Sequence, residues 1–276
     1  MRAASRRHPA LRHRGLSYRT EDGAPQSGFD FLIEHNPRAL KTYRYYATAV
    51  QAPYRNPRFQ ASAFGGLGYY GYIGFDEGVR YIVVPLLRSG FSKAQVMEGM
   101  SLAFMVGGTY ALVTIGRALK DFRWPEKAEA APDFPKGWAP DPAAFDSGLD
   151  FSTREVRPGE IEKVIGWYER TAAWVPSWVR FYARHNPAAL KGWRYRYEKA
   201  LVTLPKQILP LSLLFGAARL EQKEAIRENV LVARAFGVEL DDVIQSLGVT
   251  AVYGTEKVGL AYQAAGDVLD DWEGRT

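Results

Sequence analysis

The 276-residue sequence contains no cysteine. Without a thiol, the chain cannot form a disulfide, hold zinc through thiolates, act as a thiol peroxidase or use a cysteine nucleophile. Histidine is also scarce, with four in the whole chain. His8 and His13 belong to the start of the chain, which leaves His35 and His185 in its body. Neither has Asp, Glu or His at a spacing typical of metal ligands, so we predict no metal site.

Long apolar stretches are few. The uncharged stretch from Gly99 to Ile115 spans 17 residues, at the lower edge of what crosses a membrane. Its counterpart in the second half of the chain contains Glu256 and Lys257, which favours a buried core helix and no membrane contact. Residues 1–20 lack the apolar stretch of a secretory signal. We expect a cytoplasmic protein, although the Arg-rich, acid-poor start also has transit-peptide character.

The positive charge is confined to the start of the chain. The formal net charge is +6, and six of the 36 basic residues lie in residues 1–20, where there is no acid. The remainder therefore holds 30 basic and 30 acidic residues. A neutral body lacks the basic face that phosphate contacts require, so we expect no nucleic-acid partner. Residues 1–25 are predicted to form a basic, disordered or extended tail.

One sequence motif occurs twice in the chain. HNPRALKTYRYY begins at His35 and HNPAALKGWRYR at His185. Asparagine is a good N-cap and proline is tolerated in the first turn, so each phrase predicts the start of a helix.

Further matches keep nearly the same spacing. RSGFSKAQVMEGMSLAF from Arg88 matches AFGVELDDVIQSLGVTA from Ala235, with Gly90 and Gly237 as helix stops and Ser92 opening a capping box. A long, fixed period indicates an internal duplication. The prediction is an all-α chain with repeats at 26–122 and 160–276, joined by an extended Pro-rich linker at 123–159.

Two segments carry more specific expectations. The linker has six prolines but also recurring aromatic residues, so we expect it to be ordered and to lie across the two helical units. The stretch FGGLGYYGYIGF, from Phe64, has five glycines. They either allow close helix packing, the favoured interpretation, or open a cavity into which tyrosines such as Tyr70 project.

The second half resembles a known superfamily. LPKQILPLSLLFGAARLEQKEAIRENVLVARAFGVELDDVIQSL, from Leu204 to Leu247, is similar to the carboxymuconolactone decarboxylase and alkylhydroperoxidase D-like proteins in the order of its helices and in its ARAFG element. The first half resembles a more diverged unit of the same kind. The predicted fold is thus a tandem duplication of an alkylhydroperoxidase D-like helical unit.

The redox residues of that superfamily are missing. The resemblance places its two cysteines at Gln222 and Ala225, its histidine at Asn229 and its glutamate near Pro210. In the first half the same positions are Phe75, Gly78, Ile82 and Ala63. Thiol peroxidase activity is therefore excluded. The decarboxylase branch needs no cysteine, but it usually has a histidine where this chain has Asn229.

One polar pair occurs in both halves, at Glu77 with Arg80 and at Glu224 with Arg227. The spacing of three residues puts both side chains on one helix face. They are the candidate catalytic residues, with the glutamate as general base and the arginine holding a substrate carboxylate. A structural salt bridge is the alternative, and the pattern favours it.

His35 and His185 occupy one repeat position, just before an N-cap. Each is a candidate proton shuttle or substrate contact, or half of a paired metal site. Packing against the first turns of the following helix is the favoured interpretation.

The resemblance implies a lyase-type function. It would be a carboxymuconolactone decarboxylase-like enzyme that acts without a cofactor, by acid–base chemistry, on a small carboxylated or lactone-type substrate. Candidate substrate-binding residues are Gln222, Asn229, His185, His35 and Tyr70. The resemblance also implies a homotrimer or another homo-oligomer. The alternative is a non-catalytic binding or assembly protein that kept the fold after losing the redox site.

Overall fold

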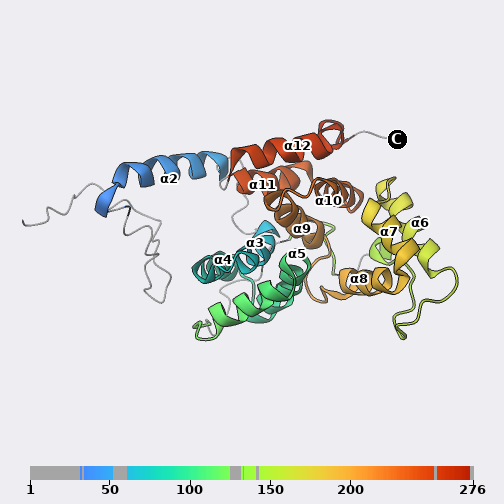
Figure 1. Cartoon of the computed structure of the whole chain (residues 1–276). Helices are drawn as coiled ribbons and strands as arrows, with labels where there is room; N and C mark the ends of the chain where they lie inside the picture. Colours follow the sequence, from blue (N-terminus) through green and yellow to red (C-terminus); the bar gives the residue numbers. More distant parts are fainter. Residues whose placement is uncertain are drawn as a thin grey trace, which may run out of the picture. The chain divides into compact units, whose positions relative to one another are not determined.

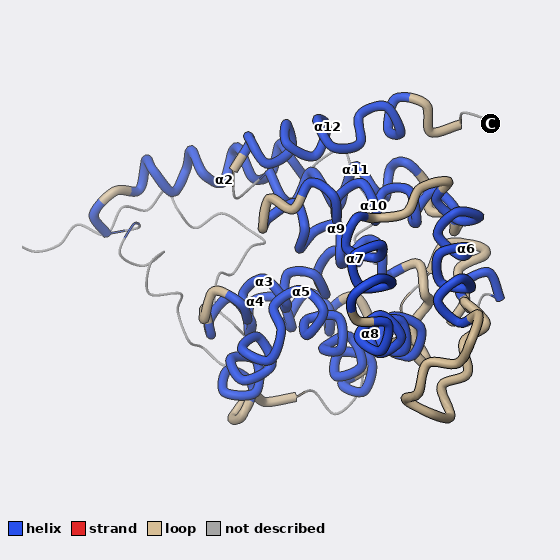
Figure 2. Tube along the Cα trace, turned by 45° about the vertical axis from the view of Figure 1, so that its right-hand side comes forward, coloured by secondary structure: helices blue, strands red, loops and turns tan. Residues whose placement is uncertain are grey.

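The described part of the chain is all-helical, as predicted. The computed structural model describes residues 32, 34–51, 61–124, 132, 134–140, 143–251 and 254–273. Within them, Figure 2 shows helices and loops and no strand. The helices, labelled in Figure 1, are α2 (Pro37–Gln51), α3 (Ala61–Tyr72), α4 (Asp76–Arg88), α5 (Lys93–Leu119), η2 (Ala143–Phe145), α6 (Glu160–Ala172), α7 (Ser177–His185), α8 (Pro187–Lys199), α9 (Ile208–Arg219), α10 (Lys223–Ala235), α11 (Leu240–Ala251) and α12 (Thr255–Asp270).

The chain divides into two compact units, residues 1–43 and 44–276. The described part of the first unit includes the start of α2. There the side chain of Asn36 accepts a hydrogen bond from the backbone amide of Ala39 at 3.1 Å, as an N-cap does. The predicted tail, residues 1–25, lies outside the described residues. The predicted boundaries near 122 and 159 stay predictions.

In the second unit, helix ends occur where the sequence predicts them. Asn186 caps α8 by accepting a hydrogen bond from the amide of Ala189. Gly90 and Gly237 end α4 and α10 in the left-handed conformation, with φ of 91° and 68°. Ser92 and Gln95 form the predicted capping box at the start of α5. These predictions are confirmed.

Helix boundaries recur at a constant spacing. Helices α9 and α10 begin and end 147 residues after α3 and α4. Helix α5 is kinked at Gly108 (φ 63°), which is 147 residues before the start of α12 at Thr255. The turns into α4 and α10 also match, because Gly74 (φ 74°) and Glu221 (φ 60°) are both left-handed.

The glycine-rich helix α3 packs closely against α5 and α9. A Cβ atom at Gly65 would lie 2.3 Å from the carbonyl oxygen of Ser212 on α9, and one at Gly68 would lie 2.8 Å from Val106 on α5. Side chains at these positions would collide with the neighbouring helices. The interpretation of the glycines as packing residues is confirmed.

The described parts of residues 123–159 pack against the core. The ring of Phe145 is buried and stacks on Tyr197 with 5.1 Å between ring centroids. Its carbonyl oxygen accepts a hydrogen bond from Arg194 at 2.7 Å. Phe134 and Trp138 also pack against the core. The role of the whole segment as a linker between repeats stays a prediction.

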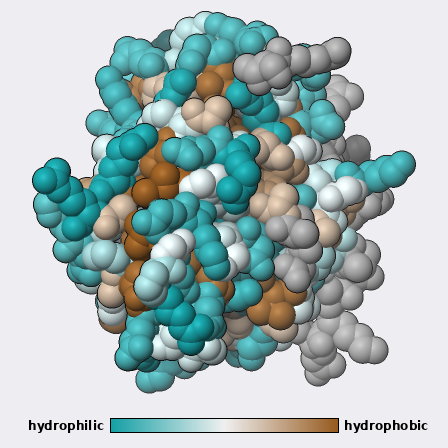
Figure 3. Space-filling view, turned by 90° about the vertical axis from the view of Figure 1, so that its right-hand side faces the viewer, coloured by the Kyte–Doolittle hydropathy of each residue, from teal (hydrophilic) through white to brown (hydrophobic). Residues whose placement is uncertain are grey.

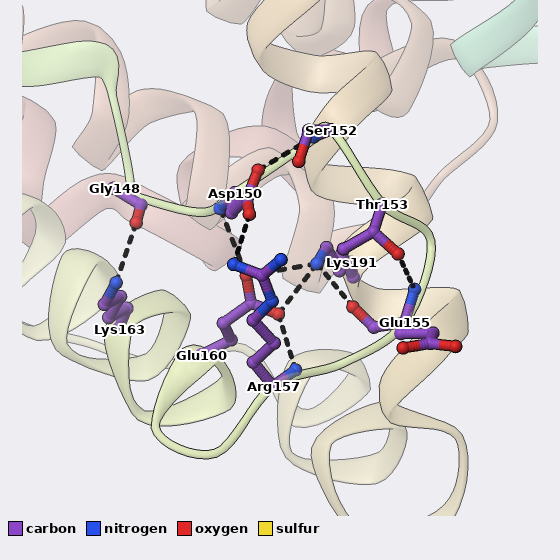
Figure 4. Close-up of polar contacts among 9 residues, drawn as sticks. All are labelled: Gly148, Asp150, Ser152, Thr153, Glu155, Arg157, Glu160, Lys163 and Lys191. Carbon is purple, nitrogen blue, oxygen red and sulfur yellow. Dashed lines mark hydrogen bonds and ion pairs between the residues drawn. The ribbon is translucent and has the colours of Figure 1, made fainter.

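A buried ion pair holds the end of this segment to α8 (Figure 4). Lys191 Nζ lies 2.8 Å from Glu160 Oε2, and neither side chain is more than 4% exposed. Lys191 also donates to the carbonyl oxygen of Glu155, while Glu160 accepts from the amides of Asp150 and Arg157. The loop before α6 is thereby tied to α8 by charge-assisted hydrogen bonds.

Among the described helices, α5 is long and apolar enough to cross a membrane by length and composition. This is weak evidence for a span, because a core helix of a soluble protein passes the same test. Residues of α5 such as Leu102 and Ile115 are buried against other helices. The cytoplasmic location stays a prediction.

Candidate functional site

A cavity of about 330 Å³ lies in the second unit. Five helices line it: α5 with Met105 and Val106, α7 with Trp178 and Tyr182, α8 with Trp193, α9 with Leu213, Gly216 and Ala217, and α10 with Ala225, Glu228 and Asn229; Gln222 precedes α10. Figure 3 views the molecule from the side of α6, α7 and α8 in Figure 1, and this face is mainly hydrophilic with narrow hydrophobic strips. The residues that line the cavity combine aromatic rings with few polar groups, a composition that is typical of small-molecule sites.

Helix α10 supplies the polar part of the cavity. Gln222, Ala225 and Asn229 are three and four residues apart, so they share one helix face. Ile226 and Val230, fully buried on the neighbouring face, hold α10 against the core. The sequence of α10 therefore fixes which of its side chains reach the cavity.

Among the residues that line the cavity, Glu228 has a pKa far from its ordinary value. Its side chain is 5% exposed, and both carboxyl oxygens accept hydrogen bonds, Oε1 from the hydroxyl of Tyr168 at 2.7 Å and Oε2 from the indole Nε1 of Trp178 at 3.0 Å. Burial raises the pKa of Glu228 to about 7, against the lowering effect of these two bonds and of the nearby Arg194. The carboxyl group can therefore gain or lose a proton near neutral pH.

Two further polar side chains of the lining, Gln222 and Asn229, are amides. Asn229 is buried, and its Nδ2 donates to the carbonyl oxygen of Ala225 at 2.7 Å, which occupies one of its two N–H groups. Gln222 lies at the N-cap position of α10. Glu228 is the one acidic residue of the lining. The lining includes no Lys, Arg or His, so no positive side chain faces the cavity.

Of the residues proposed from the sequence, Gln222 and Asn229 line the cavity together. Glu224 and Arg227 do not, and they do not pair with each other. Glu224 accepts from the backbone amide and the hydroxyl of Ser177, both at 2.6 Å, at the start of α7. Arg227 forms a bidentate pair with Asp267 of α12 at 2.7 and 2.8 Å. These hydrogen bonds connect α10 to α7 and α12, which is a structural role.

The first-half candidates also lie away from the cavity lining. Glu77 is exposed on α4. Arg80 donates from Nε to the carbonyl oxygen of Ala118 at 2.7 Å. Tyr70 is buried, with its ring 5.5 Å from that of Phe75.

The two histidines are exposed. His35 lies in the first unit, where its Nε2 is 3.9 Å from Glu34. His185 ends α7, and its ring centroid is 5.0 Å from that of Phe181 in the same helix. Among the described residues, no group of three or more His, Cys, Asp or Glu is placed to hold a metal ion.

The sequence did not point to Glu228 or to the aromatic residues of α7 that line the cavity. One signal was present for Glu228. It lies between Ile226 and Val230, so a carboxylate falls within a stretch of α10 that is otherwise rich in core residues. A charged residue in such a stretch needs buried hydrogen-bond partners, and here Tyr168 and Trp178 supply them.

Comparisons with known proteins give no relative for this chain. No protein-family model, no curated protein and no solved structure matches it. The resemblance to the carboxymuconolactone decarboxylase superfamily therefore stays a prediction.

Proposed function

We propose that this chain is a carboxymuconolactone decarboxylase-like enzyme in which Glu228 transfers protons to and from a small lactone-type substrate. The observation that supports it best is the carboxyl group of Glu228 at the wall of the cavity, with its pKa raised to about 7. A general base or acid is most effective when its pKa lies near the working pH. The reaction needs no cofactor.

The lining favours a lactone over the carboxylated substrate that the resemblance also allowed. A substrate carboxylate would lie beside the carboxyl group of Glu228 with no positive side chain of the lining to offset it. A lactone without a carboxylate avoids that repulsion. In the proposed step, the carboxylate of Glu228 takes a proton from the carbon next to the lactone carbonyl, and the electron pair moves to the carbonyl oxygen. Amide N–H groups of Gln222 and Asn229 would stabilise the negative charge there.

The proposal includes the internal duplication and the family. The spacing of 147 residues between α3–α4 and α9–α10 supports the duplication. The three positions that the resemblance assigns to the superfamily's cysteines and histidine, Gln222, Ala225 and Asn229, all line the cavity. This agreement supports the family assignment, because the resemblance rests on the sequence alone.

We also propose that the protein works as a homotrimer or another homo-oligomer. Large apolar side chains of the first half are exposed, among them Tyr72 (48%), Tyr110 (58%) and Val113 (59%). Exposed apolar side chains on neighbouring helices are typical of surfaces that a partner covers. Light scattering coupled to gel filtration tests this, and a monomer at micromolar concentration would refute it.

A non-catalytic binding protein is the second candidate function. One observation favours it: both oxygens of Glu228 already accept hydrogen bonds from Tyr168 and Trp178. A carboxyl group held in this way can serve recognition without transferring a proton.

Deuterium incorporation separates the two functions. The protein is incubated in D₂O with a panel of small lactones, and NMR follows exchange at the carbon next to the carbonyl. We expect exchange with the wild-type protein and a loss of at least about 100-fold in Glu228→Gln. Glu224→Gln is the matched control, since it neutralises a carboxylate one turn away that does not line the cavity. Equal exchange by wild type and Glu228→Gln, or loss in Glu224→Gln alone, would refute the role of Glu228.

A further inference from the structure

Aromatic side chains form one side of the cavity. Three of its lining side chains are the aromatic rings of Trp178, Tyr182 and Trp193. The ring centroids of Trp178 and Trp193 are 4.5 Å apart with the planes tilted by 55°, and those of Trp178 and Tyr182 are 6.4 Å apart. The carboxyl group of Glu228 adjoins this cluster, because it accepts the indole hydrogen of Trp178.

We propose that the cavity binds a small organic cation, with an ammonium group held between the aromatic rings and the carboxylate of Glu228. The inference rests on the proposed function for the place of binding, and it names the charge of the ligand. The substrate of the proposed reaction would then be a lactone-type compound that carries an ammonium group.

The electrostatics of the lining favour a positive charge. The face of an aromatic ring is negative, so it attracts an ammonium group, most strongly where water is excluded. Glu228 adds a negative charge when ionised, and no Lys, Arg or His of the lining competes for it. The ionised carboxyl group and the faces of the aromatic rings therefore all make the electrostatic potential in the cavity more negative. A negative potential attracts cations and repels anions.

The state of Glu228 fits the same ligand. Burial opposes ionisation of its carboxyl group and raises its pKa to about 7. Arg194 of α8 offsets part of this effect from outside the lining. A bound cation would add a positive charge on the cavity side, where the lining itself has none. An ammonium ligand therefore complements the charge of the one carboxyl group that lines the cavity.

A set of probes with matched shape tests the inference. Choline, 3,3-dimethyl-1-butanol and 3,3-dimethylbutanoate share a branched head but present a cation, an uncharged group and an anion. Isothermal titration calorimetry on the full chain measures their affinities. We expect choline to bind at least about tenfold more tightly than the alcohol, and the anion to bind more weakly than both.

Variants then locate the site. Trp193→Leu is expected to lower choline affinity about tenfold, and Trp193→Phe, which keeps an aromatic ring, to restore most of it. Trp124→Leu is the control, because Trp124 packs on Phe122 and does not line the cavity. Should Trp193→Leu fail to fold, the comparison of the three probes on the wild-type chain still decides. Equal affinity for choline and the alcohol, no choline binding at millimolar concentration, or unchanged binding by folded Trp193→Leu overturns the inference.

The outcome is separable from that of the proposed function. Selective choline binding without Glu228-dependent exchange on any lactone would support the cation site and refute the enzyme. Glu228-dependent exchange without choline binding would refute the cation site alone.

Discussion

The pH dependence of stability gives the sharpest test of the environment assigned to Glu228. The pKa of its carboxyl group is about 7 in the folded chain, against an ordinary value of 4.5. A raised pKa means that ionisation is harder in the folded state, so the folded chain is favoured below about pH 4.5 and loses stability as the pH rises to about 7. A difference of roughly 2.5 pH units, at about 1.4 kcal/mol each, corresponds to about 3.5 kcal/mol over the whole titration.

The perturbation is Glu228→Gln, which removes the titration and keeps the shape. Its free energy of unfolding, measured by urea denaturation at pH 4.5, 6 and 8, is compared with that of the wild type. We expect the variant to gain about 3 kcal/mol relative to the wild type between pH 4.5 and 8. Replacing the carboxyl group by an amide also weakens the hydrogen bond from Trp178. This loss of stability is the same at every pH, so it cancels when the pH values are compared.

The charged and titratable groups around Glu228 set the conditions of this test. Tyr168 donates from α6, Arg194 lowers the pKa from α8, and Glu224 raises it from the preceding turn of α10. Glu77→Gln, which removes the same charge from an exposed position of α4, measures the effect of net charge alone. If the difference between Glu228→Gln and wild type is the same at all pH values, the buried, hard-to-ionise carboxyl group does not exist.

Three further tests, each by urea denaturation, concern the packing, a turn and the buried ion pair. Gly65→Ala should lower the free energy of unfolding by about 2 kcal/mol because its Cβ meets a carbonyl oxygen at 2.3 Å, whereas Gly116→Ala, with no atom within 4 Å, should raise it by about 0.5–1 kcal/mol. Glu221→Gly should raise it by up to about 1 kcal/mol because φ is 60°, less the small contribution of an exposed ion pair; a decrease would contradict the strain argument. Lys191→Met should lower it by about 3–5 kcal/mol, and adding Glu160→Gln should recover part of the loss, since the uncompensated charge is then gone; no recovery would show that the pair is not coupled.

Local features of the fold could be predicted from the sequence because they depend on neighbouring residues. The caps at Asn36 and Asn186 need an amide three residues on, and the stop at Gly90 needs a residue that tolerates positive φ. The separate helix α7 was not predicted, although Pro176 and Pro187 bracket it. Its existence depends on packing around Trp178 as well as on local signals.

The site could be predicted only in part, since its geometry depends on contacts distant in sequence. Spacing put Glu224 and Arg227 on one helix face, but it could not show that their partners would be Ser177 on α7 and Asp267 on α12. Gln222 and Asn229 were identified through the resemblance, which placed them at functional positions. The aromatic side of the cavity comes from α7 and α8, and no pattern within α10 indicates it.

Two residues that border the cavity differ from the residues 147 positions earlier in the chain. Ala217 and Ala225 border the cavity, and the residues 147 positions earlier are Tyr70 and Gly78. A Cβ atom at Gly78 would lie 2.7 Å from the ring of Tyr70 and 2.4 Å from that of Phe75. The rings of Tyr70 and Phe75 therefore fill the space beside Gly78, whereas the space beside Ala217 and Ala225 is part of the cavity.

This difference predicts how to close the cavity. Ala217→Tyr introduces the residue that the first half has at the matching position, so we expect the fold to tolerate it at a cost of about 1–3 kcal/mol. Choline binding and Glu228-dependent exchange should both fall at least tenfold while circular dichroism stays helical. Ala217→Ser is the control, since it changes polarity with little change in volume. Undiminished binding by a folded Ala217→Tyr variant would mean that ligands bind elsewhere, because a tyrosine ring at this position and a ligand cannot both lie against α10 beside Ala225.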